Sequence, residues 1–502
     1  MDTPLREDKI NMQISNFRIL LLIILNIHLT TSTFAHTLEE SITMFKNGYV
    51  QEKILLIKFK DILNSNIFGK SAPINKSQFK LNTSISYKVE PVFLSGKKRY
   101  PNVPSHFAKT IKPPNLENYY YYYFTQAPTQ DQAKALLESL YADHNIAYAY
   151  FEPELFDTVI SESKLNLSHV TKTSQIEDTL DFTPGFDSTP DFQDRQNYLE
   201  SAPQGVNAKY GWATPGGTGK GIKIIDIERG WIANHEDFNL PFWSSDSNLN
   251  LEHGSAVWGV VAGKNNGTGI TGIAHESAFG FSGTVDSSGD GNYFSSAARA
   301  IELATTQLSA GDVLIIEQQT RGPISYVPAE YWELIFNAVK TASLKGIYVV
   351  AAGANGSSSL DDKANLGAFD IQVRDSGAVL VGAGAPPTSF NHLSRVWLSN
   401  FGNRIDAFGY GEDVTTTGFG DLYGTNPTNN YTARFSGTSS ATAIVAGVVA
   451  ALSGIAKAEG KLLTPLQMRE ALRKTGTQQK GNTNERIGNL PDISELHKYI
   501  NR

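Results

Sequence analysis

The 502-residue sequence contains no cysteine, which excludes disulfide-stapled folds, thiolate metal sites and a cysteine nucleophile. It also lacks an excess of positive charge, because 43 Lys and Arg residues face 50 Asp and Glu residues for a formal net charge of -7. We therefore expect no nucleic-acid partner, since binding a phosphate backbone needs a broad basic surface. Charged residues make up only 19% of the chain and hydrophobic residues 40%, a balance typical of a globular protein with a large core.

Long hydrophobic runs are scarce as well, and the one that stands out lies near the N-terminus, at residues 19–25 after Arg18. A basic residue, a short apolar segment and a stretch of small residues ending at Ala35 are typical of a secretory signal peptide. The apolar segment is too short to span a bilayer permanently, so a retained anchor is the weaker alternative. We expect residues 1–35 to be removed, with Met12 as an alternative start. The protein would then be secreted, to an extracellular or periplasmic location, with no membrane partner beyond the signal peptide.

Residues 36–155 carry a small α/β pattern of their own. The aromatic run at residues 119–124 favours a strand. Thr129 is followed three residues later by Gln132, a capping box that predicts a helix from there to about residue 143. A second strand is predicted at residues 146–151. A strand-helix-strand module between a signal peptide and a larger domain is typical of a folding-assistant propeptide, and a general accessory domain is the alternative.

The composition changes twice after this module. Residues 156–190 are rich in Ser, Thr, Asp and Asn, which predicts an exposed linker. From residue 191 to 502, apolar strands alternate with helical stretches, and this alternation predicts a mainly parallel sheet with helices on both faces, an α/β fold class. The predicted strands are residues 221–226, 313–316, 347–352 and 378–381, and the predicted helices include residues 294–304 and 329–344.

A turn of small residues at 435–442 leads into an apolar helix that runs towards Gly460. Ser439 lies at the start of this helix, among unpaired backbone N–H groups and the positive end of the helix dipole. A developing oxyanion is stabilised in that position, and the small neighbours let a substrate backbone approach closely. Ser439 is therefore a candidate nucleophile, although a simple cap of a buried helix uses the same residue types.

A serine nucleophile needs a base, and His253 opens a second small-residue helix. Asp226 ends the apolar run that starts at Gly221, so its carboxylate should emerge at the carboxyl edge of the sheet, where α/β sites form. Each residue alone would more often be structural, but the order Asp, His, Ser is hard to obtain by accident. His235 is a rival base nine residues after Asp226; we interpret it as a solvated loop residue.

These residues resemble the motifs of the subtilisin-like serine peptidases, whose triad runs Asp, His, Ser along the chain. The family's Gly-Thr-Ser-x-Ala-Thr motif is matched at residues 437–442, and its His-Gly-Ser/Thr-x-Val-x-Gly motif at residues 253–259. The resemblance covers residue 191 to the C-terminus, including closing stretches at residues 463–465 and 475–477. It implies a subtilisin-like domain of three layers.

The resemblance also implies a role for each residue. Ser439 would attack the peptide carbonyl, His253 would take and return the proton, and Asp226 would fix the tautomer of the histidine. A secreted endopeptidase made as a proenzyme is implied, with polypeptide substrates and its own propeptide as partners and no cofactor required for the chemistry. The family's Asp-Ser/Thr-Gly pattern is replaced here by the longer run of residues 226–230, a departure that leaves all three catalytic groups present.

Asn355 is implied as the side-chain donor of the oxyanion hole. It follows a predicted strand, where the family carries Ala-Gly-Asn, but the run at residues 352–356 is one residue longer. The alternative is that Asn355 and Gly356 are only a turn pair. An extended substrate should add as a strand between two enzyme edges, predicted near residues 288–292 and 318–322. Gln318 and Gln319 replace smaller family residues at the second edge, so an altered or narrowed first pocket is expected.

A structural calcium ion is left open, and the metal ligands are unknown. Asp361 and Asp362 invite that interpretation, but paired loop aspartates are usually solvated, and calcium needs six or more oxygens. Two other functions compete with a peptidase. A catalytically inactive subtilisin-like binding protein is the first alternative. An esterase ranks lower, because no Gly-x-Ser-x-Gly motif precedes an Asp and then a His.

Overall fold

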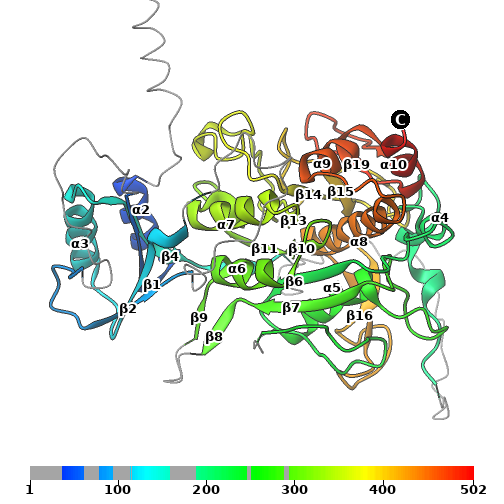
Figure 1. Cartoon of the computed structure of the whole chain (residues 1–502), viewed down its shortest axis with the longest axis horizontal. Helices are drawn as coiled ribbons and strands as arrows, with labels where there is room; N and C mark the ends of the chain where they lie inside the picture. The colour runs from blue at the N-terminus through cyan, green and yellow to red at the C-terminus, as the bar shows by residue number, and fades with distance from the viewer. Residues whose placement is uncertain are drawn as a thin grey trace, which may run out of the picture.

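The computed structural model describes residues 37–60, 79–93, 114, 116–158, 188–245, 250–287 and 293–502 (Figure 1). The expected signal peptide at residues 1–35 lies outside the described residues. So do residues 159–187, which make up most of the expected linker.

An eight-stranded sheet in the order β18-β19-β15-β14-β13-β10-β6-β7 organises the C-terminal part of the chain. Its strands are β6 (Lys223–Glu228), β7 (Ala278–Gly283), β10 (Val313–Ile316), β13 (Tyr348–Ala352), β14 (Val379–Gly384), β15 (Ala407–Tyr410), β18 (Thr477–Gln478) and β19 (Asn489–Leu490). All neighbouring strands pair in parallel except β18 and β19. Strands β10, β13 and β14 are buried along their whole length, as in a parallel sheet covered on both faces. The predicted α/β fold class is confirmed.

Two groups of helices cover this sheet. Helix α8 (Gly437–Ala458) crosses β10, β13, β14 and β15 and packs against α5 (Leu251–Ala262). Helices α6 (Ala297–Gln307) and α7 (Glu333–Leu344) pack against each other and against neighbouring strands. The remaining helices are α4 (Ala208–Trp212), α9 (Pro465–Lys474) and α10 (Ile493–Ile500). Helix α8 is long and apolar enough to cross a membrane, but its apolar window is fully buried, so we interpret it as the central core helix.

Short elements complete the C-terminal part. Strands β8 (Val285–Ser287) and β9 (Tyr293–Ser295) pair with each other, as do β16 (Val414–Thr417) and β17 (Tyr431–Phe435). Strands β11 (Gln318–Arg321), β12 (Tyr326–Pro328) and β5 (Leu155–Asp157) form a three-stranded sheet. Single helical turns in this part are η5 (Gln193–Arg195), η6 (Asn197–Leu199), η7 (Ala329–Tyr331) and η8 (Lys363–Asn365), and a further one, η2 (Leu116–Asn118), precedes β3 of the N-terminal module.

The N-terminal module is a four-stranded antiparallel sheet with two helices, at the left of Figure 1. The sheet order is β2-β3-β1-β4, from β2 (Tyr87–Pro91), β3 (Tyr119–Phe124), β1 (Val50–Phe59) and β4 (Ile146–Pro153); the helices are α2 (Leu38–Lys46) and α3 (Gln130–Ala142). The predicted capping box of Thr129 and Gln132 is present at the start of α3.

This module docks on helices α6 and α7. The hydroxyl of Tyr121 lies 2.9 Å from Oγ of Ser296, the residue that caps α6. Asn337 of α7 donates to the hydroxyl of Tyr119 at 2.8 Å. These contacts place the end of β4 beside the C-terminal domain. One residue later the chain enters β5, which pairs with β11 of that domain.

Candidate active site

Ser439 and His253 each lie in the first turn of a buried helix. Ser439 is the third residue of α8, and His253 is the third residue of α5. Nε2 of His253 lies 2.9 Å from Oγ of Ser439, and both side chains are fully buried. Gly437 opens α8 with a φ of 87°, a left-handed conformation that favours glycine. The structure thus brings together two of the residues predicted from sequence in hydrogen-bonding geometry.

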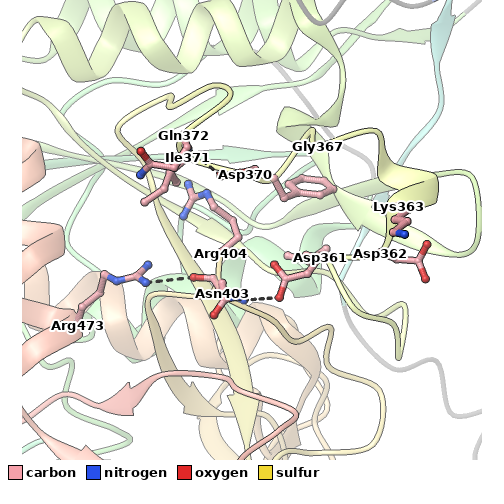
Figure 2. Close-up of a pocket in the computed structure, with 12 residues that line it drawn as sticks. Asp361, Asp362, Lys363, Gly367, Asp370, Ile371, Gln372, Asn403, Arg404 and Arg473 are labelled. Atoms are coloured by element: carbon pink, nitrogen blue, oxygen red, sulfur yellow. Dashed lines mark hydrogen bonds between the residues drawn. The ribbon is translucent and has the colours of Figure 1, made fainter.

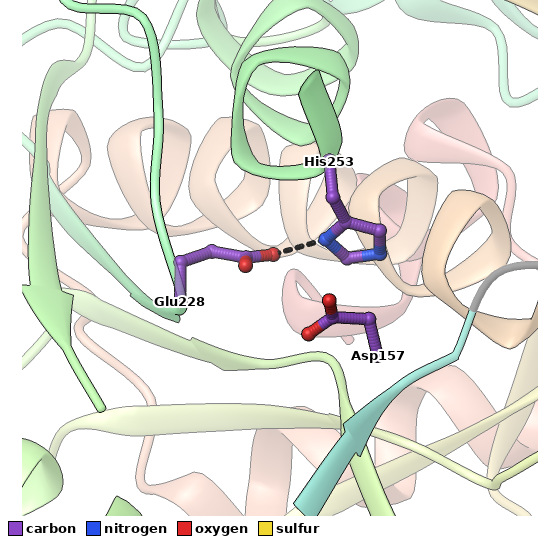
Figure 3. A group of neighbouring side chains, drawn as sticks. All are labelled: Asp157, Glu228 and His253. Carbon is purple, nitrogen blue, oxygen red and sulfur yellow. Dashed lines mark hydrogen bonds and ion pairs between the residues drawn. The ribbon is translucent and has the colours of Figure 1, made fainter. Parts of the chain in front are cut away.

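The carboxylate that contacts His253 belongs to Glu228, not to Asp226 (Figure 3). Oε1 of Glu228 is hydrogen-bonded to Nδ1 of His253, the ring nitrogen that faces away from Ser439. The sequence predicts Asp226 for this position because it ends an apolar run. Strand β6 instead continues to Glu228, and two residues along a strand are about 6.6 Å apart, so Asp226 stops one step short of the ring.

Glycine at position 254 lets α5 approach the end of β6. A Cβ atom at Gly254 would lie 2.4 Å from the carbonyl oxygen of Gly230 and 3.2 Å from Cγ of Glu228. A signal for Glu228 was present in the sequence. Glu228, Arg229 and Gly230 align with the pattern Asp-Ser/Thr-Gly without an insertion, if glutamate is accepted in place of aspartate and arginine in place of Ser or Thr.

Asp226, Glu228 and Glu317 form a buried carboxyl cluster behind the histidine. Each offers an oxygen within 4.8 Å of the others, and all three side chains are fully buried. Burial, followed by the charge of Glu228, raises the pKa of Asp226 well above its usual range; burial and both neighbouring carboxyls do the same for Glu317. Among the described residues, no side chain donates a hydrogen bond to the carboxylates of Asp226 or Glu317, and the backbone N–H of Ile227 only partly offsets the rise in the pKa of Asp226. Burial therefore favours the protonated form of both carboxyls, because no positive charge in the described part of the chain is paired with either of them.

Glu228 differs from the other two carboxyls of the cluster because it is paired with His253, and the two groups neutralise each other's charge. Burial opposes the charged form of His253, but the carboxylates of Glu228 and then Asp157 outweigh it and raise the pKa of the imidazole to about 9. Burial also raises the pKa of Glu228, and the charge of His253 acts in the opposite direction. Within the carboxyl cluster the negative charge is therefore favoured on Glu228, where it stabilises an imidazolium.

Residues 155–158 lie across the front of Ser439 as an extra strand. β5 pairs antiparallel with β11, which places Asp157 opposite Gln318. Beyond β5, the N–H of Thr158 donates to the carbonyl oxygen of Glu317 at 3.1 Å. The carbonyl oxygen of Thr158 accepts the N–H of Ser439 at 3.3 Å, and Oγ1 of Thr158 lies 2.5 Å from Oγ of Ser439. The main chain at Thr158 is placed as the acyl side of a substrate would be.

This strand bears on two predictions from the sequence. The linker expected from residue 156 begins with β5, and β5 pairs with the edge predicted at residues 318–322. The other predicted edge, residues 288–292, lies outside the described residues. Gln319 is buried and links β5 to the next loop: its Nε2 donates to the carbonyl oxygen of Asp157 at 3.4 Å, and its Oε1 accepts the N–H of Asn355 at 2.8 Å.

Asn355 is oriented by its side-chain oxygen. Oδ1 accepts the N–H of Thr438 at 3.0 Å and the hydroxyl of Thr438 at 2.9 Å, so the NH₂ group lies at the other end of the amide. A Cβ atom built on Gly437 would be 3.0 Å from Nδ2 of Asn355 and 2.0 Å from the carbonyl oxygen of Thr158. The donor and the carbonyl oxygen therefore flank the same point above Gly437. The additional residue before Asn355 is accommodated by Ala354, whose φ is 73°.

The profile of the Subtilase family matches residues 169–489 of this chain. The chain belongs to the subtilase family. It is a serine-type endopeptidase, and its relatives are bacterial enzymes. M-protease of Shouchella clausii (strain KSM-K16) is 27% identical over 365 residues, which cover 71% of this chain and 86% of that protein. Subtilisin E of Bacillus subtilis (strain 168) is 27% identical over 289 residues, 56% of this chain and 67% of that protein.

The fold of this subtilase also has a solved counterpart. The crystal structure of fervidolysin from Fervidobacterium pennivorans, a keratinolytic enzyme related to subtilisin, matches with a TM-score of 0.54. The match covers 90% of this chain and 62% of that chain at 16% identity, which shows the fold alone. The family and the fold thus agree with the α/β architecture and with the resemblance predicted from the motifs.

His235 of this subtilase lies apart from the serine. Its Nε2 is 3.0 Å from the carbonyl oxygen of Asn430, and its Nδ1 accepts the N–H of Asp237 at 3.2 Å. Both ring nitrogens are hydrogen-bonded to loop backbone, so His235 has a structural role. The sequence predicts a solvated residue, whereas the structure shows His235 buried.

Two groups of described side chains could hold a metal ion. One is Asp157, Glu228 and His253, whose ligand atoms lie within 4.8 Å of one another and of which His253 and Glu228 are hydrogen-bonded. The other is the carboxyl cluster, with three of the six or more ligands that calcium takes. Asp361 and Asp362 belong to neither group. They line a pocket of about 510 Å³ beside Arg404 and Arg473 (Figure 2). There the carboxylate of Asp361 accepts the N–H of Asn403, and that of Asp362 accepts the N–H of Ala364, so both act as backbone caps.

Proposed function

We propose that this subtilase is made as an exported proenzyme in which Ser439, His253 and Glu228 form the catalytic triad. Residues 1–35 would direct export, residues 36–158 would be the propeptide, and residues 191–502 the peptidase domain. The observation that carries the proposal is the position of Thr158. The carbonyl oxygen of Thr158 accepts the N–H of Ser439, and Oγ of Ser439 is hydrogen-bonded to His253. The carbonyl group of Thr158 is thus held beside the serine hydroxyl that would attack its carbon.

Acyl transfer follows from this geometry. Ser439 Oγ attacks the carbonyl carbon as Nε2 of His253 takes the hydroxyl proton. Glu228 stays ionised throughout, keeps the proton on Nδ1 and stabilises the imidazolium that forms. His253 then gives the proton to the leaving nitrogen, and water hydrolyses the acyl-enzyme by the same route. These steps use only side chains and water.

The negative charge that develops on the carbonyl oxygen needs donors. The N–H of Ser439 is one, because first-turn N–H groups have no partner within the helix. We propose Nδ2 of Asn355 as the second, since Thr438 holds the other end of that amide and directs the NH₂ group towards Gly437.

Asn355→Leu should lower kcat about 100- to 1000-fold and leave KM within a few-fold. Loss of one such donor in subtilisin has this effect, roughly 3–4 kcal/mol of transition-state stabilisation, because the bond strengthens only as charge develops. Steady-state kinetics of the purified variant on a peptide substrate measure both constants. Near-normal turnover by a folded Asn355→Leu enzyme would show that another donor fills the oxyanion hole.

Self-cleavage should occur between Thr158 and Val159. The released N-terminal fragment should therefore end at Thr158, which intact-mass measurement of the fragment tests, and later trimming after residue 159 would not alter that end. Thr158→Pro removes the N–H that donates to Glu317 and should abolish this cut. A fragment that ends elsewhere, with normal processing of the Thr158→Pro chain, would contradict the proposed maturation site.

A catalytically inactive binding protein is the alternative. The formed pair of His253 and Ser439 argues against it, because a serine held against a histidine and a peptide carbonyl is arranged for attack. The direct test is to incubate the purified protein with an unstructured polypeptide and identify the fragments by mass. Absence of internal cleavage, together with a chain that never loses residues 36–158, would overturn the proposal.

A further inference from the structure

We propose that the second residue before the cleaved bond is recognised as a carboxylate, by Arg229 and Asn250. The inference rests on the proposed function and names a class of substrate for it: peptides with Asp or Glu two residues before the cut. In this chain's own sequence that position is Asp157, which precedes Thr158. We call the pocket around this side chain the second subsite.

Asp157 reaches into the C-terminal domain and not into solvent. Its side chain is only 5% exposed, and one oxygen of its carboxylate, Oδ2, accepts a hydrogen bond from Nδ2 of Asn250. The same oxygen lies 3.9 Å from Nη1 of Arg229, whose side chain is 32% exposed. Figure 3 shows the carboxylate pointing towards the space between Glu228 and His253. A carboxylate buried in this position is therefore stabilised by the side-chain amide of Asn250 and by the guanidinium of Arg229.

The turns that carry the triad also build the second subsite. Arg229 directly follows Glu228 at the end of β6, and Asn250 directly precedes α5, in whose first turn His253 lies. Asn250 adopts a φ of 52°, which starts α5 abruptly and leaves its amide beside the substrate strand. Recognition of this side chain is therefore tied to the geometry of the catalytic groups.

The balance of charges around Asp157 favours a negative group. Within 4.8 Å, its carboxylate meets an oxygen of Glu228 and a nitrogen of His253, which neutralise each other when the imidazole is protonated. The other two members of the carboxyl cluster, Asp226 and Glu317, add no charge while they are protonated. Arg229 then presents a positive charge to the subsite, with Nη1 3.9 Å from Oδ2 of Asp157. An imidazolium forms in the transition state, so a carboxylate here also stabilises the reacting enzyme.

The test uses three quenched fluorescent peptides that copy residues 154–160, Glu-Leu-Phe-Asp-Thr-Val-Ile, with Asp, Asn or Lys at the position of Asp157. Mature enzyme should cleave the Asp peptide with a kcat/KM about fivefold above the Asn peptide, the size expected of a partly exposed ion pair. The Lys peptide should be cleaved more slowly than the Asn peptide, because its ammonium group would face Arg229.

Arg229→Gln should bring the ratio of the Asp and Asn peptides close to one. Arg195→Gln is the matched control: it removes the same charge from an exposed residue of η5, and the ratio should stay near five. Equal cleavage of the Asp and Asn peptides by the unmodified enzyme, or a preference for Lys, would overturn this inference and leave the proposed function standing. Failure to cleave any of the three peptides would overturn the proposed function and this inference with it.

Discussion

Replacing Glu228 by glutamine is expected to lower kcat about 10⁴-fold, with little change in the fold. In subtilisin, removal of the triad carboxylate alone costs about 3 × 10⁴-fold in kcat. A glutamine NH₂ group can donate to Nδ1 of His253, which fixes the tautomer whose Nε2 carries the proton and cannot accept one from Ser439. The variant would mature slowly by itself, so a trace of active enzyme should remove its propeptide before kcat is measured.

Asp226→Asn is the matched control for this experiment. Burial raises the pKa of Asp226 well above its usual range, so a neutral amide resembles the protonated acid and kcat should stay within about tenfold. A 10⁴-fold loss for Asp226→Asn with mild effects for Glu228→Gln would reverse the assignment of the triad carboxylate.

The pH profile gives a second readout on Glu228. Its carboxylate favours the imidazolium and contributes to the raised pKa of His253, so Glu228→Gln lowers that pKa. The base works only when neutral, and activity rises as the pH passes its pKa. The acid limb of kcat/KM should therefore move to lower pH in Glu228→Gln and stay in place in Asp226→Asn.

Ser439→Ala is expected to reduce turnover about 10⁶-fold and to leave the propeptide attached, the largest effect we expect from any single change. Loss of the nucleophile in subtilisin costs about 2 × 10⁶-fold in kcat. Self-cleavage after Thr158 uses the same hydroxyl, so the purified variant should retain residues 36–158 as one continuous chain. Intact-mass measurement, together with peptide kinetics, tests both expectations.

Ser436→Ala provides the control at the same helix. Ser436 precedes α8, and its side chain makes no capping hydrogen bond, so its removal should leave processing and turnover near normal. If purified Ser439→Ala still loses residues 36–158 without added enzyme, the cut is not made by this active site. Normal processing would then contradict self-maturation, whatever the peptide kinetics show.

The sequence determined the fold class and singled out two residues that the structure brings into hydrogen-bonding contact. Ser439 and His253 could be found because each opens a helix whose small residues form a local motif, and local motifs survive without knowledge of distant contacts. The helix α3 was equally readable, since the capping box of Thr129 and Gln132 acts within a single turn.

Tertiary structure decided which carboxylate meets the histidine. Asp226 and Glu228 lie two residues apart and share one face of β6, so an apolar pattern cannot tell which of them reaches His253. The answer depends on where β6 ends against α5, and Gly254 sets that approach. The place of Asp157 and Thr158 in front of Ser439 likewise depends on pairing between β5 and β11, strands about 160 residues apart. Strand pairing at such a distance is carried by backbone hydrogen bonds, which every sequence can make, and so leaves no motif to read.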